Sequence, residues 1–350
     1  MALIPTTILT GFLGAGKTTL LNQILQAPHG LRIAVIENEF GPENIDHDIL
    51  LQDRNEQIIE MNNGCICCTV RGDLIVALSN LAQRRDAGEL YFDRVVIETT
   101  GLANPGPVAQ TFFVDEIVAS QYMLDAVVTI VDARHGMAQL DTYEEAQRQI
   151  GFADRVLLSK RDLVTDQTIA ELTARIRRIN PRVAIGDTAF GHADLAQILD
   201  IRGFNLNDKL DIDPEFLSDP AQLAAHDHRE EGHQGDDHLH GHLESHHHPL
   251  HTDDIKAFAF KTLREFDSAR LNDFLSGLVQ VYGPRMLRYK GVLAMHGAAR
   301  KVVFQGVHQI MGSDIGALWG EHEPRESKMI FIGKKLPEEI FIRGLEQCLV

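Results

Sequence analysis

A glycine-rich segment near the start of the chain carries the residue types needed to bind phosphate groups. Residues Gly11–Thr18 read GFLGAGKT and match the pattern G-x-x-x-x-G-K-[ST]. The glycines allow successive backbone N–H groups to point inward at phosphate oxygens. In such a loop Lys17 reaches the β- and γ-phosphates, and the Thr18 hydroxyl is a ligand for Mg²⁺. A glycine-rich turn without a ligand is the alternative, but the complete pattern between a predicted strand and a predicted helix favours a nucleoside triphosphate.

Glu98 and Gly101 belong to a second segment that could serve the same nucleotide. They lie in ETTG, whose first residue, Glu98, ends the apolar run Arg94–Glu98. A carboxylate at the carboxyl edge of a parallel strand, beside the phosphate loop, is placed to hold Mg²⁺ or its bound water. Gly101 would let a backbone N–H approach the γ-phosphate. Asp132, at the end of another predicted strand, is a weaker candidate for the magnesium site, because an aspartate that begins a turn explains it equally well.

A third segment indicates which base the nucleotide carries. Ser159, Lys160 and Asp162 lie in SKRD, where guanine-selective phosphate-loop proteins carry Asn-Lys-x-Asp. A carboxylate only accepts hydrogen bonds, so Asp162 suits the N1–H and 2-amino donors of guanine, whereas adenine offers an acceptor there. The Lys160 stem can lie along the plane of the base. A helix-capping aspartate beside a surface lysine is the alternative interpretation, and serine replaces the usual asparagine.

Three thiols occur within four residues of the sequence NGCICC, at Cys65, Cys67 and Cys68. Thiolates suit Zn²⁺, Cu(I) or another thiophilic ion, and three sulfurs leave a tetrahedral site open for a further ligand. A redox pair or merely buried small residues are the alternatives. Carboxylates that could complete the metal shell lie in the segment ENEFGPE, at Glu37, Glu39 and Glu43.

Ten of the 17 histidines fall within residues His226–His251, which we call the histidine tract. The tract also contains six acidic residues and one arginine, and it has almost no apolar residues with which to form a core. We therefore predict a disordered linker that collects Zn²⁺ or Ni²⁺ weakly and exchangeably. A solvated spacer is the alternative, and a purification tag fits less well because the run is internal and interrupted.

Apolar runs alternate with helix-like segments before the histidine tract, which predicts an α/β unit with a parallel sheet covered on both faces. The expected strands are Ile4–Thr10, Leu31–Glu37, Arg94–Glu98, Ala126–Asp132 and Arg155–Ser159. The expected helices include Thr18–Leu25, Leu74–Arg85 and Ile169–Ile179.

The region after the tract predicts a small α+β domain with a mostly antiparallel sheet. Its expected strands are Ile255–Lys261, Met286–Met295, Lys301–Val307 and Met329–Ile332, and its expected helices are Ser268–Val281 and Pro337–Leu345. We therefore expect three regions, 1–210, 211–253 and 254–350, of which the middle one is the linker.

Charge and composition exclude several classes of function. The 33 basic and 50 acidic residues give a net charge of −17, which argues against binding nucleic acid or an anionic membrane surface. A hydrophobic content of 44% argues against wholesale disorder. No signal peptide and no membrane-spanning run is expected. Four cysteines, three of them clustered, do not form a disulfide scaffold, so we expect a cytoplasmic protein.

Together these motifs resemble the CobW family of phosphate-loop GTPases, a group of metallochaperones, and within it most closely the zinc chaperones. The matching segments are GFLGAGKTTLLN, IENEFG, NGCICC, ETTGLANPGP, SKRD and LRYKGVL, which span nearly the whole chain. The combination of Cys-x-Cys-Cys with a phosphate loop is specific to this group. The resemblance implies a phosphate-loop NTPase domain of the SIMIBI class, with a mostly parallel sheet, followed by a CobW C-terminal α+β domain.

The resemblance also implies GTP hydrolysis, with Mg²⁺, coupled to delivery of Zn²⁺, or of Co²⁺ or Ni²⁺, to a client metalloprotein. Its implied catalytic residues are Lys17, Glu98 and Gly101. Its implied nucleotide-binding residues are Gly11, Gly14, Ala15, Gly16, Lys17, Thr18, Thr19, Ser159, Lys160 and Asp162, with Thr18 also on Mg²⁺. Its implied ligands for the transferred metal are Cys65, Cys67 and Cys68, to which the carboxylate of Glu37 is added.

Two other classes of function remain open from the sequence. One is a non-enzymatic metal store or sensor in which the histidine tract dominates and the nucleotide is structural. The other is an ATP-dependent, kinase-like phosphate-loop enzyme. No nucleic-acid or membrane partner is expected, and the sequence leaves open whether the chain forms a homo-oligomer.

Overall fold

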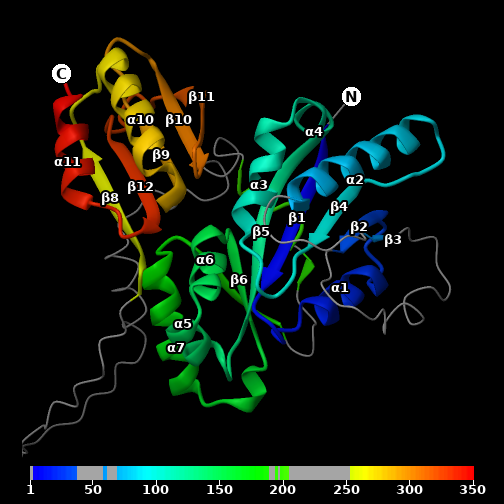
Figure 1. Cartoon of the computed structure of the whole chain (residues 1–350). Helices are drawn as coiled ribbons and strands as arrows, with labels where there is room; N and C mark the ends of the chain where they lie inside the picture. The colour runs from blue at the N-terminus through cyan, green and yellow to red at the C-terminus, as the bar shows by residue number, and fades with distance from the viewer. Residues whose placement is uncertain (1–2, 38–57, 61–68, 189–193, 196–197, 205–252) are drawn as a thin grey trace, which may run out of the picture.

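The computed structural model of this chain describes residues 3–37, 58–60, 69–188, 194–195, 198–204 and 253–350. These residues form an α/β unit and a second unit built on a separate antiparallel sheet (Figure 1). The three clustered cysteines, the histidine tract and the expected linker 211–253 lie outside the described residues, apart from position 253. No helix in the described ranges has both the length and the apolar character needed to cross a membrane.

The first unit is built on a seven-stranded sheet in which neighbouring strands all run parallel, as the sequence predicts. The strand order β3-β2-β4-β1-β5-β6-β7 puts the strand before the phosphate loop at the centre. The strands are β1 (Ile4–Gly11), β2 (Ile33–Glu37), β3 (Ile58–Glu60), β4 (Arg94–Glu98), β5 (Tyr122–Asp132), β6 (Arg155–Ser159) and β7 (Ala184–Thr188).

Helices cover both faces of this sheet. Successive side chains of a strand point to opposite faces, so neighbouring residues of β1 pack against different helices. Ile8 packs in the cluster that contains apolar residues of α2, α3, α6 and α7, whereas its neighbour Leu9 packs in the cluster that contains those of α1. The helices are α1 (Lys17–Gln26), α2 (Thr69–Asp86), α3 (Pro105–Val114), α4 (Glu116–Gln121), α5 (Gly136–Thr142), α6 (Glu144–Phe152) and α7 (Asp166–Ile179), with a short 3₁₀ turn η1 (Arg161–Leu163).

The second unit is a five-stranded antiparallel sheet in the order β11-β10-β9-β12-β8. Aromatic rings of Phe258, Phe331 and Phe341 pack together in its core. Its elements are β8 (Ile255–Thr262), α10 (Ser268–Tyr282), η4 (Gly283–Arg285), β9 (Met286–Leu293), β10 (Arg300–Val307), β11 (Ile310–Leu318), β12 (Ser327–Lys334) and α11 (Glu338–Gln347).

Some elements are longer than the sequence predicts, and others carry weak signals. The helix expected at Leu74–Arg85 begins at Thr69, and the strand expected at Ala126 begins at Tyr122. The sequence signal of helix α3 is obscured by two prolines and a glycine in its first turn. Asn104 nevertheless caps that turn by accepting a hydrogen bond from Gly106 N. Strand β11 is mostly exposed, so it lacks the apolar run that reveals the others.

Helix α6 lies at the junction between the two units, next to β8 and β9 (Figure 1). The Gln147 side chain accepts hydrogen bonds from the backbone N–H groups of Asp254 and Ile255, where β8 begins. Gly151 lies so close to β9 that an added Cβ would lie 2.8 Å from the end of the Leu287 side chain. The helix is therefore packed tightly against the second unit.

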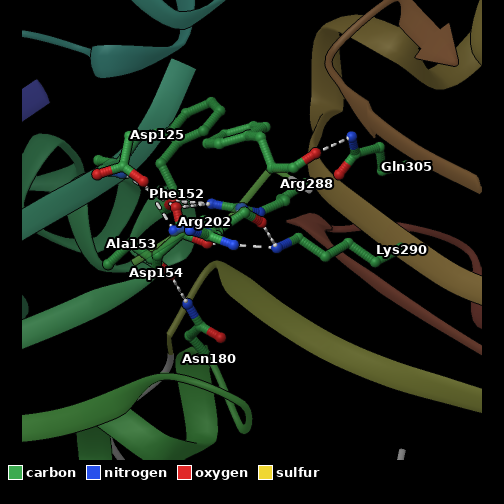
Figure 2. Close-up of polar contacts among 12 residues, drawn as sticks. Asp125, Phe152, Ala153, Asp154, Asn180, Arg202, Arg288, Lys290 and Gln305 are labelled. Atoms are coloured by element: carbon green, nitrogen blue, oxygen red, sulfur yellow. Dashed lines mark hydrogen bonds and ion pairs between the residues drawn. The ribbon is translucent and has the colours of Figure 1, made fainter. Parts of the chain in front are cut away.

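A buried ion pair crosses the same junction (Figure 2). The Asp154 side chain, just after α6, is 1% exposed, and that of Arg288 on β9 is 4% exposed. Arg288 donates to both carboxylate oxygens of Asp154 and also to the carbonyl oxygen of Phe152. Lys290, two residues further along β9, contacts the same carboxylate at 3.2 Å. The single carboxylate of Asp154 therefore pairs with two cations, Arg288 and Lys290, that are largely buried at the junction.

Replacing Asp154 with alanine is expected to lower the free energy of unfolding by about 3–5 kcal/mol, because Arg288 would stay buried without its charge partner. The matched control is Glu89→Ala, which removes an exposed pair with Arg84 and should cost about 1 kcal/mol or less. Urea unfolding of both variants measures the difference. Equal losses in the two variants would show that the buried pair does not hold the junction.

Candidate nucleotide and metal site

The phosphate loop lies at the carboxyl end of β1, between the centre of the sheet and helix α1. Gly11 passes so close to β5 that an added Cβ would lie 2.4 Å from the carbonyl oxygen of Ile130. Gly14 and Gly16 have φ values of +72° and +100°, which disfavour residues with side chains. Ala15 is fully buried between them. The loop geometry therefore requires glycine at three of the positions that the sequence analysis selected.

Lys17 begins α1 and folds back over the loop that precedes it. Its Nζ atom donates to the carbonyl oxygens of Gly11 at 3.1 Å and Phe12 at 3.4 Å. Burial lowers the pKa of the Lys17 ammonium below its usual value, and the negative charge of Glu98 opposes that shift. The cation is thus held beside the loop, where phosphate oxygens can replace the two neutral carbonyl oxygens as its hydrogen-bond acceptors.

Thr18 and Thr19 are exposed in the first turn of α1, and Thr18 contacts the end of β4. The Thr18 Oγ1 atom donates to Glu98 Oε1 at 2.9 Å. The sheet register places Glu98 beside Leu9 on one side and beside Glu37 on the other. The structure therefore brings together a hydroxyl and a carboxylate that are 80 positions apart in the chain. Two hard oxygen donors at a phosphate loop are the kind of ligands that Mg²⁺ prefers.

Gly101 lies against the phosphate loop in the turn that follows β4. An added Cβ at Gly101 would lie 2.5 Å from the Leu13 side chain and 2.7 Å from its backbone nitrogen. The turn is closed by a hydrogen bond from Ala103 N to the carbonyl oxygen of Thr100 at 3.1 Å. The structure therefore places Gly101 beside the phosphate loop.

The predicted base-reading segment also contacts the phosphate loop. Ser159 Oγ donates to the carbonyl oxygen of Ala15 at 2.7 Å. Lys160 Nζ donates to the carbonyl oxygen of Gly14 at 2.8 Å and to Asp132 Oδ2 at 2.7 Å. Lys160 has a φ of +56°, an uncommon value for a residue with a side chain. The hydroxyl of Ser159 therefore joins β6 to the phosphate loop at the position where asparagine is usual.

Asp132, a weaker candidate for the magnesium site, organises the turn after β5. Its carboxylate accepts hydrogen bonds from the backbone N–H groups of Arg134 and His135 and from the side chain of Lys160. Burial works to raise the pKa of Asp132, but these bonds, with one to the His135 ring, outweigh it and hold the pKa below its usual value. Asp162 is exposed in η1, two residues after Lys160, whose side chain is hydrogen-bonded to the phosphate loop.

The predicted metal ligands are mostly outside the part of the chain that the structure describes. This applies to Cys65, Cys67 and Cys68 and to the candidate carboxylates of Glu39 and Glu43. Glu37 is described: it ends β2, is partly exposed, and pairs in register with Glu98. Within the described ranges, no group of three or more His, Cys, Asp or Glu residues is arranged to hold a metal ion.

Two family models match the chain. The model described as "CobW/HypB/UreG, nucleotide-binding domain" matches residues 5–186. The model described as "Cobalamin synthesis protein cobW C-terminal domain" matches residues 255–349. The chain belongs to the CobW family. This result confirms the resemblance drawn from the motifs, and the two matches coincide with the two units of the structure.

Relatives in the CobW family are similar over most of this chain. The zinc chaperone YjiA of Escherichia coli (strain K12) is 38% identical over 339 residues, which is 96% of each chain. The zinc chaperone CobW of Pseudomonas aeruginosa is 33% identical over 380 residues, covering 100% of this chain and 92% of its own. The crystal structure of Zn(II)-bound YjiA GTPase from E. coli matches all of both chains, with 32% identity and a TM-score of 0.74.

Two residues at the nucleotide site were not selected from the sequence. Leu13 occupies a variable position of the phosphate-loop pattern, and its close contact with Gly101 depends on the folded turn. Gln149 lies in α6 and contacts the Gly101 turn through its side chain. A buried glutamine in a helix carries no periodic or motif signal, so its contact with a distant loop becomes apparent only in three dimensions.

Proposed function

We propose that this chain is a GTP-hydrolysing chaperone that carries zinc to a client metalloprotein. The observation that carries the proposal is the contact between Thr18 and Glu98 beside the buried ammonium of Lys17, at the mouth of a complete phosphate loop. Its relatives bear the names of zinc chaperones and of a zinc-regulated GTPase. The match to the YjiA structure covers the whole chain and includes the C-terminal unit, which supports a shared function.

Thr18 and Glu98 are the residues that would hold Mg²⁺, since they offer a hydroxyl and a carboxylate at one point. When bound, Mg²⁺ would neutralise the negative charge of the phosphates. Lys17 would bind the terminal phosphates by exchanging its bonds to the loop carbonyls. Gly11, Gly14 and Gly16 shape a backbone whose N–H groups would receive the phosphate oxygens. The turn at Gly101 would approach the γ-phosphate from the side of β4.

Zinc is the cargo in this proposal, and Cys65, Cys67 and Cys68 are its proposed ligands. Cobalt or nickel could bind the same thiolates, since both metals accept sulfur and nitrogen ligands. Glu37 ends the strand beside Glu98, so the sheet places one candidate ligand next to the proposed magnesium carboxylate. Loss of the γ-phosphate would therefore alter the site close to Glu37, after which the sequence continues from β2 towards the cysteines.

Removing the carboxylate in Asp162→Ala is expected to lower the affinity for GTP by about 10-fold or more, because hydrogen bonds to charged groups contribute about 1.5–3 kcal/mol. The affinity for ATP should stay unchanged, so the preference for guanine is lost. Asp166→Ala is the matched control, because Asp166 is also an exposed aspartate, in the first turn of α7.

Competition of GTP and ATP against a fluorescent GTP analogue measures both affinities in the wild type and in the two variants. Equal affinity of the wild-type protein for GTP and ATP would contradict the proposed nucleotide. An unchanged preference in Asp162→Ala would contradict the role of that carboxylate.

A further inference from the structure

Gln149 connects helix α6 to the turn that follows Glu98. Its side chain is buried, with 1% of the residue exposed. Its Nε2 atom donates to the carbonyl oxygen of Gly101 at 3.1 Å and to that of Ala103 at 3.1 Å. One amide group therefore satisfies two carbonyl groups of a turn that lies 46–48 positions away in the chain.

The helix that carries this amide is fixed to its surroundings on other sides. Thr129 Oγ1, on strand β5 beside the central β1, donates to the backbone carbonyl of Gln149 at 2.9 Å. Asn180 Nδ2 donates to the carbonyl oxygens of Ile150 and Ala153, each at 2.9 Å. Because the backbone at Gln149 and just after it is held by buried hydrogen bonds, its amide is a rigid support rather than a mobile surface group.

The turn that Gln149 holds has little freedom to change its distance from the phosphate loop. Gly101 touches Leu13 so closely that no side chain larger than hydrogen fits there. Thr99, just before the turn, is fixed to β1 by a hydrogen bond from its N–H to the carbonyl oxygen of Leu9 at 3.0 Å. The turn is thus pinned at its start by β1 and at its far end by Gln149.

We propose that Gln149 is a positioning residue for GTP hydrolysis, which holds the Gly101 turn against the phosphate loop. The inference rests on the proposed function. Gln149 acts through the carbonyl groups of the turn and not by contact with the nucleotide. Loss of its amide releases the turn, so the γ-phosphate loses an oriented neighbour while the rest of the nucleotide keeps its contacts. Small displacements of positioning groups have large effects on rate.

The variant that tests this role is Gln149→Met, which keeps the length of the side chain and removes both hydrogen bonds. We expect kcat for GTP hydrolysis to fall by about tenfold or more. The affinity for GDP should change by less than about twofold, since GDP has no γ-phosphate for the turn to meet. Steady-state kinetics and GDP titration give the two quantities.

The chain offers a matched control two residues earlier on the same helix. Gln147 is also buried, and its side chain bonds to the carbonyl oxygen of Leu140 at 2.8 Å and to the start of β8. Gln147→Met removes the same kind of bonds without touching the Gly101 turn. It should destabilise the fold by a similar amount and keep kcat within about twofold of the wild type.

The outcomes separate the inference from the proposed function. Wild-type protein that does not hydrolyse GTP would contradict the proposed function itself. Wild-type turnover with equal kcat in Gln149→Met, or an equal fall in both methionine variants, would overturn the positioning role. Gln149→Asn covers the case in which the methionine variant does not fold: it keeps the amide but withdraws it by one methylene, so its kcat should also fall, and a wild-type kcat would contradict the inference.

Discussion

Replacing Lys17 with alanine is expected to lower kcat/KM for GTP hydrolysis by at least about 100-fold, the usual effect of removing a charge-stabilising group at a reacting centre. In the structure its ammonium lies beside the phosphate loop and is bonded to the carbonyl oxygens of Gly11 and Phe12. Alanine would leave the loop in place but remove the cation that meets the terminal phosphates. Steady-state phosphate release measures the loss.

Lys17→Met is the companion variant, because it fills the same volume without a charge. Its thermal stability should equal or exceed that of the wild type, since burial lowers the pKa of the Lys17 ammonium and so disfavours its charged form. Turnover should nevertheless fall as far as in Lys17→Ala. Wild-type turnover in the methionine variant would show that the positive charge has no part in the reaction.

Replacing Cys65, Cys67 and Cys68 together with serine is expected to weaken zinc binding by at least about 1000-fold, because most of the binding free energy of such sites comes from thiolate ligands. Serine keeps the size of the side chain but its hydroxyl stays protonated at neutral pH. Competition with a zinc chelator of known affinity measures the change. Unchanged zinc affinity in the triple variant would contradict the assignment of the metal site.

Deleting Asp227–His251 from the histidine tract is the control for this measurement. A chaperone that carries zinc on its cysteines should keep one tightly bound equivalent after the deletion. A metal store that depends on the tract should lose nearly all of its capacity and should be little affected by the cysteine replacements. The two variants therefore distinguish a chaperone that carries zinc on its cysteines from a non-enzymatic metal store.

The sequence predicts the part of the site whose residues are fixed by local pattern and sheet topology. Lys17 and Thr18 follow a motif, and Glu98 ends an apolar strand that a parallel sheet must bring to the same edge as the phosphate loop. The contact between Thr18 and Glu98 follows from these two facts. The parallel sheet was predictable because burial on both faces produces continuous apolar runs, and the antiparallel second unit was predictable from the alternating pattern at Ile255–Lys261.

Contacts that depend on single side chains across long distances could not be predicted in this way. Gln149 reaches the Gly101 turn only because α6 packs beside β5, and nothing in its neighbouring residues marks that position. Ser159 weakens the guanine motif in the sequence, yet its hydroxyl donates to the carbonyl oxygen of Ala15 in the structure. The buried pair of Asp154 and Arg288 joins two units whose packing no local pattern encodes.

A zinc titration with and without nucleotide tests most directly whether nucleotide state governs metal transfer. The protein is titrated with Zn²⁺ when bound to a non-hydrolysable GTP analogue with Mg²⁺, when bound to GDP, and when free of nucleotide. We predict that the Kd for zinc differs by at least about tenfold between the GTP-analogue and GDP states, within the usual range of coupling between two sites. In Lys17→Ala this difference should disappear. The same Kd for zinc in all three states of the wild-type protein would contradict the coupling of GTP hydrolysis to metal delivery.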